Sequence, residues 1–296
     1  MTMPPEKISV IVPVYSADAY LLEMLERLFL PGLRLYAGRR VELVLIDDAS
    51  PLGRETEALA RAAQQWADVV HYRNSVNLGY VRSVNKGLSL ATGDRLLVCN
   101  SDTRLAPLAL ARLEAALDAD ERLGMAGPVS NSAFNAKLQQ CARLPRPLAS
   151  FSAGELAALD VFGRAVAAAP AAPVEAAWLL GFCTLIRRKV VEEIGPLDEG
   201  FGFGYLEELD YAVRARRAGW RLAVVPDAFV FHGGLRRGLQ AAGPNAGSQT
   251  ARAFRLRTFF RIARGFVYLV CKHGWKAARQ PQDGDGASDY GRYLEK

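Results

Sequence analysis

Three clusters of small polar and acidic residues each follow a short apolar run, and they are the first candidates for chemistry. The clusters are Pro13-Val14-Tyr15, Asp47-Asp48-Ala49-Ser50 and Asn100-Ser101-Asp102. A carboxylate in such a place can ligate a hard divalent cation that also holds a diphosphate, or accept hydrogen bonds from a base or a ribose. It can equally cap the next helix or close an Asx turn. Each cluster alone therefore leaves both roles open.

The densest acidic cluster is Glu207-Glu208-Leu209-Asp210. Glycines at 200, 202 and 204 alternate with aromatic residues just before it, which is typical of a loop that bends tightly or moves. At helical spacing Glu207 and Asp210 share one face, whereas Glu208 points toward the preceding loop. A carboxyl group in a partly desolvated pocket has a raised pKa and can act as a general base. The alternative is an acidic first turn favoured by the helix macrodipole.

Three further features have both a functional and a structural interpretation. Arg82 and Lys86 are four residues apart and share a helix face, which suits phosphates or base edges but also a solvated surface. His232 follows an apolar run and is either a hydrogen-bonded structural residue or, if the fold brings it to Asp102, a ligand. Trp178 suits stacking on a sugar ring and equally suits the core.

Apolar runs alternate with helical patterns up to Leu117, and these elements must position the clusters. The expected strands are Ile8–Val14, Val41–Ile46, Val69–Tyr72 and Arg95–Cys99, and the expected helices are Asp18 to about Leu30, Glu55–Trp66, Leu78–Ala91 and Pro107–Leu117. Four strand–helix repeats predict an α/β fold with a mostly parallel, Rossmann-like sheet and helices on both faces. Ligands bind at the carboxyl ends of such strands, where the three clusters fall.

The second half of the chain is less regular. Residues 130–176 contain prolines and an alanine-rich stretch, and we interpret them as an insertion. The later expected elements are a strand over Trp178–Arg187, helices over Lys189–Ile194 and Glu207–Ala218, short strands over Arg221–Val225 and Ala228–Phe231, and a helix over Arg252–Lys272. From Gln280 onward the sequence predicts a polar tail.

The composition excludes several classes of protein. The chain has 296 residues, of which 50% are apolar, so it can bury one large α/β core. A disordered chain, a collagen-like fibre and a disulfide scaffold do not fit. No apolar run approaches the ~20 residues of a membrane span. The four cysteines are far apart and form no CxxC pair, so a reduced cytoplasm is the expected location.

The net charge of +6 is concentrated in the C-terminal region. No Asp or Glu lies between Ala228 and Gln282, whereas ten of the 37 basic residues do, so the remainder of the chain is net negative. Aromatic residues alternate with arginines over 251–279, which predicts a basic amphipathic helix. Such a helix suits an anionic membrane surface or a nucleic acid, or it packs on the domain through its arginine stems.

Four segments in order resemble one family. They are Ile8 to Tyr15, Leu45 to Ser50, Asn77–Gly87 running on to Asn100-Ser101-Asp102, and Gly204 to Asp210 with Arg214 and His232 downstream. Together they look like the family-two inverting glycosyltransferases, which have the GT-A fold. The resemblance covers about residues 8–235. We therefore expect a glycosyltransferase domain over 1–235 and a basic helical extension with a polar tail over 236–296.

The resemblance implies a role for each matching residue. Glu208, six residues before Arg214, is the implied general base, and Asp102 with His232 would hold Mn²⁺ or Mg²⁺ on the donor diphosphate. The expected donor nucleotide-binding residues are Pro13, Val14, Tyr15, Asp47, Asp48, Asn77, Arg82, Lys86, Asn100 and Ser101. The acceptor is expected against the 130–176 insertion and four residues, namely Trp178, Gly181, Glu207 and Asp210.

Two departures from the family pattern concern these same positions. Asn100 stands where other members carry Asp, which leaves Asp102 as the only carboxylate of the metal motif. Glu208 stands where Asp is frequent, and its side chain is one methylene longer.

The implied reaction is a single displacement that moves a sugar from a nucleotide-diphosphate sugar to a hydroxyl of a glycan or lipid-linked acceptor. The expected place is the cytoplasm or the inner face of the membrane, with 251–279 facing the anionic surface and no nucleic acid as partner.

Two alternatives come from other classes of protein. A sugar-nucleotide-forming nucleotidylyltransferase needs a glycine-rich loop after the first strand, and 14–18 contain no glycine. A non-catalytic nucleic-acid-binding protein explains the basic region but leaves Asp48, Asp102 and Glu208 without a role.

Overall fold

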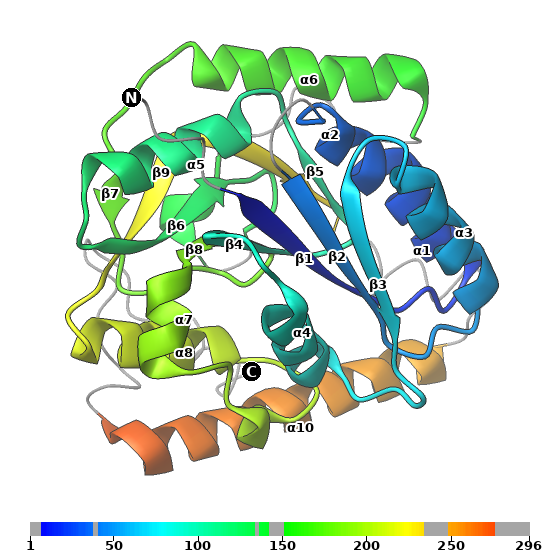
Figure 1. Cartoon of the computed structure of the whole chain (residues 1–296). Coiled ribbons are helices and arrows are strands. Elements are labelled where there is room, and N and C mark those ends of the chain that lie inside the picture. Colours follow the sequence, from blue (N-terminus) through cyan, green and yellow to red (C-terminus); the bar gives the residue numbers. More distant parts are fainter. Residues whose placement is uncertain (1–6, 38–40, 134–135, 142–150, 234–247, 276–296) are drawn as a thin grey trace.

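The computed structural model describes residues 7–37, 41–133, 136–141, 151–233 and 248–275, and these form one nine-stranded sheet with helices around it (Figure 1). The strands are β1 (Ile8–Val14), β2 (Val41–Asp47), β3 (Asp68–Arg73), β4 (Arg95–Cys99), β5 (Thr103–Leu105), β6 (Leu123–Val129), β7 (Val174–Glu175), β8 (Cys183–Arg187) and β9 (Arg221–His232). Their order is β3-β2-β1-β4-β8-β6-β9-β5, with β7 on the side of β9.

The first four strands are parallel, as the strand–helix pattern predicts, and the rest of the sheet is mixed. β8 runs antiparallel to both β4 and β6, β6 and β9 are parallel to each other, and β5 is antiparallel to β9. The carboxyl ends of β1, β2 and β4 therefore lie at one edge of the sheet, where their polar clusters meet.

Helices cover both faces of the sheet, which confirms the predicted layering. They are α1 (Ala19–Glu23), the π-helical turn η1 (Met24–Phe29), α2 (Leu30–Arg34), α3 (Gly53–Ala63), α4 (Tyr80–Leu90), α5 (Ala109–Ala119), α6 (Ala153–Ala167), α7 (Arg188–Ile194), α8 (Glu207–Arg217) and α10 (Ser248–His273), with short 3₁₀ turns η2 (Lys137–Gln139) and η3 (Glu199–Phe201). Side chains of η1, α2, α3 and α5 share one core cluster, and those of α4, α7 and α8 share the other. In Figure 1, α6 lies along the top and α10 along the bottom.

Alternating residues of β1 divide between the two core clusters. Val10 and Val12 point to the face covered by η1 and α2, and Ile11 points to the other face.

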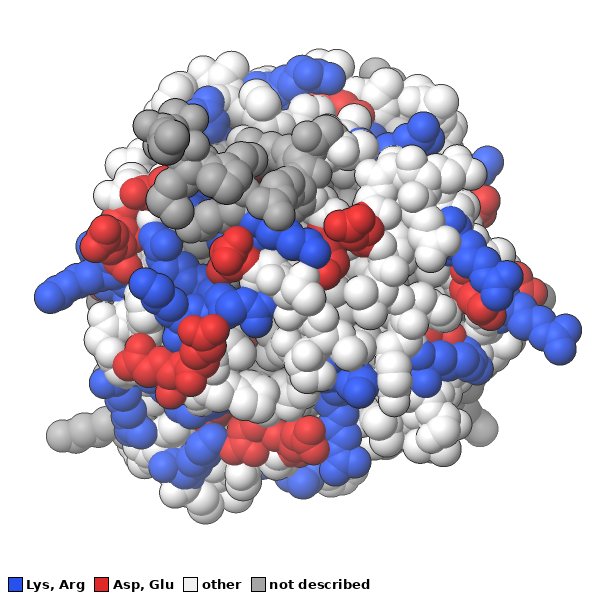
Figure 2. Space-filling view, viewed as in Figure 1, with Lys and Arg blue, Asp and Glu red and all other residues white. Residues whose placement is uncertain are grey.

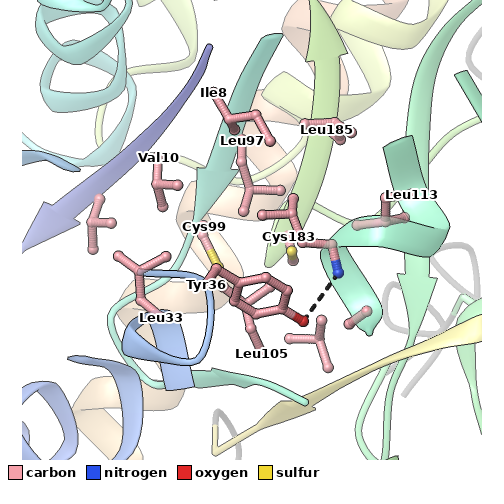
Figure 3. Close-up of a cluster of buried hydrophobic side chains, with 14 of the residues drawn as sticks. Ile8, Val10, Leu33, Tyr36, Leu97, Cys99, Leu105, Leu113, Cys183 and Leu185 are labelled. Atoms are coloured by element: carbon pink, nitrogen blue, oxygen red, sulfur yellow. Dashed lines mark hydrogen bonds between the residues drawn. The ribbon is translucent and has the colours of Figure 1, made fainter. Parts of the chain in front are cut away.

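Tyr36 belongs to the same cluster as Val10 and Val12. Its hydroxyl donates a hydrogen bond to the carbonyl of Ala106 and accepts one from the N–H of Leu110 at 3.3 Å (Figure 3). The buried hydroxyl is thereby satisfied. This packed cluster fixes the strand ends that carry the polar residues.

Three expected boundaries are wrong. The first helix does not end near Leu30 but continues to Arg34. Pro31 lies at the start of α2, directly after the wider π turn of η1, where a proline is accommodated. The two strands expected at 221–231 are one strand, β9, with a register shift between Val225 and Phe229. The expected strand from Trp178 begins only at Cys183.

Three strands, β5, β6 and β7, and one helix, α6, were not predicted at all. β5 and β6 are short or rich in glycine, and they are recognised as strands only through their pairing with β9. The interval expected as an insertion contains α6, which packs on β9 with the rings of Phe162 and Phe229 4.8 Å apart, edge to face. Arg104 of β5 adds a bidentate pair with Asp160 of α6. This helix therefore belongs to the packed body of the fold.

Basic and acidic side chains are interspersed over the face seen in Figure 2, and no charge of one sign dominates it. None of the helices in the described ranges combines the length and the apolarity needed to cross a bilayer.

Candidate active site

Asp48 lies just after β2 and holds the loop before α4 against the sheet edge. Its carboxylate accepts hydrogen bonds at 2.8 Å from the backbone N–H groups of Leu78 and Gly79 and from the side-chain amide of Asn74. Gly79 has a φ of +86°, which a side chain rarely adopts, and a Cβ there would come within 2.9 Å of the Phe203 backbone. Asp48 thus determines the shape of the loop that contains Asn77.

The neighbouring residues of this edge differ in exposure. Tyr15, directly after β1, has a side chain that is 41% exposed, whereas Val14 is buried. Asp47 is fully buried, and its carboxylate accepts hydrogen bonds from Arg73 and from the N–H of Ser50. Of the two adjacent aspartates, the structure therefore uses Asp47 to hold the turn after β2.

Asp102 and His232 face each other, as the sequence analysis requires for a joint site. Asp102 ends the turn between β4 and β5, and its carbonyl accepts a hydrogen bond from the N–H of Gly233 at 2.8 Å. The Nε2 atom of His232 is 3.6 Å from the Asp102 carboxylate. The Nδ1 atom of His232 is 3.1 Å from the carbonyl of Ser132, and a proton on Nδ1 leaves the lone pair of Nε2 directed at Asp102.

The rest of this turn is tied to the loop before β8. The N–H of Asn100 donates to the carbonyl of Phe182 at 2.9 Å, and the Thr103 hydroxyl donates to the carbonyl of Asn100. The ring of Phe182 stacks on that of His232, with centroids 5.0 Å apart. Ser101 lies in the same turn and is partly buried.

Glu207 and Glu208 open α8 at the wall of an apolar cavity. Leu206 and Tyr205 precede them with φ values of +71° and +79°, which hold the chain in a sharp turn. The cavity is lined by Tyr80, Val84, Leu88, Val98, Met125, Leu179, Gly181, Thr184, Ile186, Leu197, Glu207, Glu208 and Tyr211. One carboxylate oxygen of Glu207 is buried without a hydrogen-bond partner in the structure.

Burial changes the acid strength of both carboxyl groups. It raises the pKa of Glu208 to about 7. Burial and the nearby charge of Glu208 raise the pKa of Glu207 well above its usual range. Two neighbouring carboxyl groups in one apolar cavity do not readily ionise together, so the first negative charge resides on Glu208.

A continuous line of contacts joins the three acidic positions. Gly79, bonded to Asp48, is followed by Tyr80, whose hydroxyl donates to the carbonyl of Gly181 at 3.0 Å. Gly181 and Glu208 line the same cavity, and a Cβ added at Gly181 would lie 3.9 Å from the Cβ of Glu208. The next residue is Phe182, which stacks on His232 beside Asp102. Contacts between neighbouring residues therefore link Asp48, Glu208 and Asp102.

Several other candidate residues make contacts within the protein. Arg82 pairs with Glu199 at 3.0 Å, and Lys86 lies over the ring of Tyr72, 4.3 Å from its centroid. Trp178 is 8% exposed and belongs to the core cluster around α8. Its position favours the structural interpretation of that tryptophan.

Tyr80 and Asn131 are site residues that the sequence analysis did not single out. Tyr80 lies within the Asn77–Gly87 segment that carried the resemblance, so the sequence could have indicated it as a site residue. It connects Gly79, which is bonded to Asp48, with the cavity. Asn131 exchanges two hydrogen bonds with the backbone of His232, which is far away in sequence, and no local pattern indicates this pairing.

Asp210 holds α10 onto α8. Its fully buried carboxylate bonds Arg214 at 2.8 Å and both His273 and Lys272 at 2.7 Å. Burial alone would raise the pKa of Asp210, but these partners outweigh it and lower the pKa. The structure thus gives Asp210 a role in anchoring the C-terminal helix behind the turn that positions Glu208.

We expect the substitution Asp210→Asn to reduce the free energy of unfolding by about 3 kcal/mol, because it leaves Arg214 and His273 without the buried carboxylate and leaves Lys272 with Asp198 alone. Urea unfolding measures this. The control is Glu199→Gln, which removes the half-exposed pair with Arg82 and should cost less than about 1 kcal/mol. Equal effects of the two substitutions would contradict the anchoring role.

The comparisons with known proteins agree with this architecture. The chain is 28% identical over 242 residues, 75% of each chain, to the N-acetylglucosaminyl-diphospho-decaprenol L-rhamnosyltransferase of Mycobacterium tuberculosis. It is 32% identical over 130 residues, 44% of this chain and 38% of the relative, to the undecaprenyl-phosphate 4-deoxy-4-formamido-L-arabinose transferase of Klebsiella pneumoniae.

Solved structures show the same fold. A mannosyltransferase from Pyrobaculum calidifontis, in complex with GDP-Man and Mn²⁺, superposes with a TM-score of 0.58 at 19% identity, over 98% of this chain and 68% of that one. GalNAc-T7 with UDP, GalNAc and Mn²⁺ gives a TM-score of 0.56 at 19% identity, over 77% of this chain and 44% of that one.

The family model described as "Glycosyltransferase like family 2" matches residues 4–258, most of the chain. This match and the named relatives set aside the nucleotidylyltransferase and the non-catalytic nucleic-acid-binding protein. The chain belongs to glycosyltransferase family 2, and it is a glycosyltransferase with the GT-A fold.

Proposed function

We propose that the protein transfers a sugar from a nucleotide-diphosphate sugar to a hydroxyl group of a glycan or lipid-linked acceptor, with inversion at the anomeric carbon. The observation that supports this proposal is the series of contacting residues that links Asp48, Glu208 and Asp102. A donor bound along these residues would have its nucleotide at the β1–β2 edge, its diphosphate at Asp102 and its sugar toward Glu208.

The nucleotide of the donor would contact residues that follow β1 and β2. Pro13, Val14 and Tyr15 border the edge from β1, and Tyr15 offers an exposed ring. Asp48 holds the Asn77 loop in place, and we infer that this loop and Asp48 face the base and ribose. Asn100 and Ser101 lie closer to the diphosphate position, because they precede Asp102 in its turn.

Asp102 and His232 fit a divalent cation. A carboxylate oxygen and an imidazole nitrogen lie 3.6 Å apart, and both are partly exposed. Within the described residues no cluster of three or more His, Cys, Asp or Glu suited to a metal occurs, so water and the donor diphosphate would supply the remaining ligands. A Mn²⁺ or Mg²⁺ ion held there would neutralise the charge that develops on the leaving diphosphate.

Glu208 is suited to accept the proton of the acceptor. In the proposed step its carboxylate takes the hydroxyl proton while the hydroxyl oxygen bonds to the anomeric carbon. The bond from that carbon to the diphosphate oxygen breaks, and the electron pair leaves with the diphosphate. A base with a pKa of about 7 is about half ionised at pH 7 and is still basic enough to assist.

The acceptor side is inferred from the same cavity and from the relatives. Gly181 and Glu207 line the wall next to Glu208, so they are the nearest candidates for acceptor contacts. The M. tuberculosis relative is named for a diphospho-decaprenol acceptor, and the K. pneumoniae relative for undecaprenyl phosphate. We therefore propose a lipid-linked acceptor, approached at the inner face of the membrane.

A binding screen tests the donor assignment. Thermal unfolding is followed with UDP, GDP, dTDP and their sugar conjugates, each with Mn²⁺ and with a chelator. We expect one base to raise the unfolding temperature by several degrees only when the cation is present. Stabilisation by none of these ligands, or the same stabilisation with chelator, would contradict the proposal.

The pH dependence of kcat/KM should follow the ionisation of Glu208. Because the base must be ionised and the pKa of Glu208 in the free protein is about 7, kcat/KM should rise about tenfold per pH unit below pH 6, reach half its maximum near pH 7 and level off above pH 8. Initial rates at substrate concentrations well below KM, between pH 5 and 9, measure this. A flat profile over that range would exclude Glu208 as the group whose ionisation limits the rate.

A further inference from the structure

The two sides of α10 differ in their surroundings. Gly265 and Leu269 are buried, and Leu269 packs in a small core cluster with Phe201 and Leu206 of the turn before Glu208. On the opposite side, Phe260 is 66% and Val267 61% exposed. Positions 260 and 267 are seven residues apart, so both side chains project from one helix face. The exposed residue Cys271, four residues further on, continues this outer face.

The charge of α10 has one sign. The sequence of the helix contains six Arg and Lys residues and no Asp or Glu. Lys272 is bound inward to Asp198 and Asp210. Arg261 lies over the ring of Phe203, and Arg264 reaches the carbonyl of Gly200. The outer face of α10 is therefore exposed and apolar, on a helix whose sequence is net positive, and it can bind a partner.

Of the partners that could cover this face, an anionic bilayer fits its chemistry. A nucleic acid would use the cations but not the exposed Phe260 and Val267. A second copy of the chain would bring two all-basic helices together, which repel each other. A bilayer with anionic lipids accepts the apolar side chains at the boundary of headgroups and acyl chains, while the arginines reach the phosphates.

We propose that the outer face of α10, formed by Phe260, Val267 and Cys271, docks on the surface of an anionic membrane. Because the inner side of α10 packs against the turn that leads into Glu208, docking sets the active site beside the bilayer. The docking face is inferred from the residues of α10 alone. Its use in reaching a lipid-linked acceptor rests on the proposed function.

Vesicle co-sedimentation of the full chain tests the docking face. We expect wild type to bind phosphatidylcholine vesicles containing phosphatidylglycerol, and to bind less as salt rises or when phosphatidylglycerol is left out. The double variant Phe260→Ser/Val267→Ser should partition about tenfold less. The control is Val161→Ser on α6, where a valine of similar exposure, 66%, lies away from α10; it should bind as wild type does.

Several results would overturn the docking face. They are no binding by wild type, equal binding by the double variant, tighter binding to single-stranded DNA than to vesicles, or a wild-type dimer that the double variant abolishes in light scattering. Circular dichroism confirms that the variants are folded, and Phe260→Ala gives a milder second test. Turnover of a detergent-soluble acceptor should be the same in wild type and double variant, so loss of vesicle binding and failure of the proposed reaction are separate outcomes.

Discussion

Replacement of Glu208 by Gln should lower kcat about 10³-fold while the donor still binds with wild-type affinity. Gln keeps the size and polarity of the side chain but cannot take a proton, and a positioned general base contributes on the order of 10²–10⁴ in rate. The side chain lies on the cavity wall and not at the nucleotide edge, so donor contacts should persist. Initial rates with radiolabelled donor and calorimetric titration of the donor measure the two effects.

The matched control for this substitution is Glu192→Gln, which removes an exposed carboxylate of α7. It should leave kcat within a factor of about two. A second variant, Glu208→Asp, keeps the carboxylate but withdraws it by one methylene, and it should retain more activity than Glu208→Gln. If Glu208→Gln turned over at near the wild-type rate, the assignment of the base would be wrong.

Replacement of Asp102 by Ala should weaken cation-dependent binding of the donor by about 100-fold or more. Asp102 is the only carboxylate that faces His232 in the described structure, and water and diphosphate alone leave the ion without a charged protein ligand. Calorimetric titration of donor with and without Mn²⁺ measures the change. Asp68→Ala, which removes an 81% exposed carboxylate of β3, serves as control.

Unchanged donor binding by the Asp102→Ala variant would contradict the proposed cation site. If the variant bound donor in the presence of Mn²⁺ as tightly as wild type does, the cation would be held elsewhere or would play no part in donor binding. Titration of Mn²⁺ alone, followed by the electron paramagnetic resonance signal of the free ion, reports the same site without any turnover.

The sheet was predictable where the local pattern and the tertiary structure agree. The runs of β1, β2 and β4 are mostly apolar and buried on both faces, and β1 is rich in β-branched residues, which is the pattern of a parallel strand in the middle of a sheet. β6 could not be recognised in the same way, because its sequence Leu-Gly-Met-Ala-Gly-Pro-Val has weak strand propensity and its place depends on pairing with β8 and β9. The end of the first helix was predicted too early, because Pro31 lies at the start of α2, directly after the π-helical turn η1, and does not break the helix there.

The candidate site was partly predictable, for reasons that can be named. Asp48 and Asp102 follow strands that end at one edge, so topology alone places them near each other. The sequence could not show which acidic residues of a cluster have a structural role. Asp47 is bound by Arg73 and Asp210 by His273, and both partners are distant in sequence. The role of His273 had no local signal. Glu208 was distinguished from Glu207 by the resemblance, and the structure adds the different effect of burial on each pKa.

The anomeric configuration of the product tests the account at its centre. With the donor base found by the screen, the linkage formed on an acceptor is examined by proton NMR, through the coupling constant of the anomeric hydrogen where the sugar allows and the one-bond carbon–hydrogen coupling otherwise. Direct attack by a hydroxyl deprotonated at Glu208 predicts a configuration opposite to that of the donor. A product with the donor's own configuration would contradict a single displacement and the role given to Glu208.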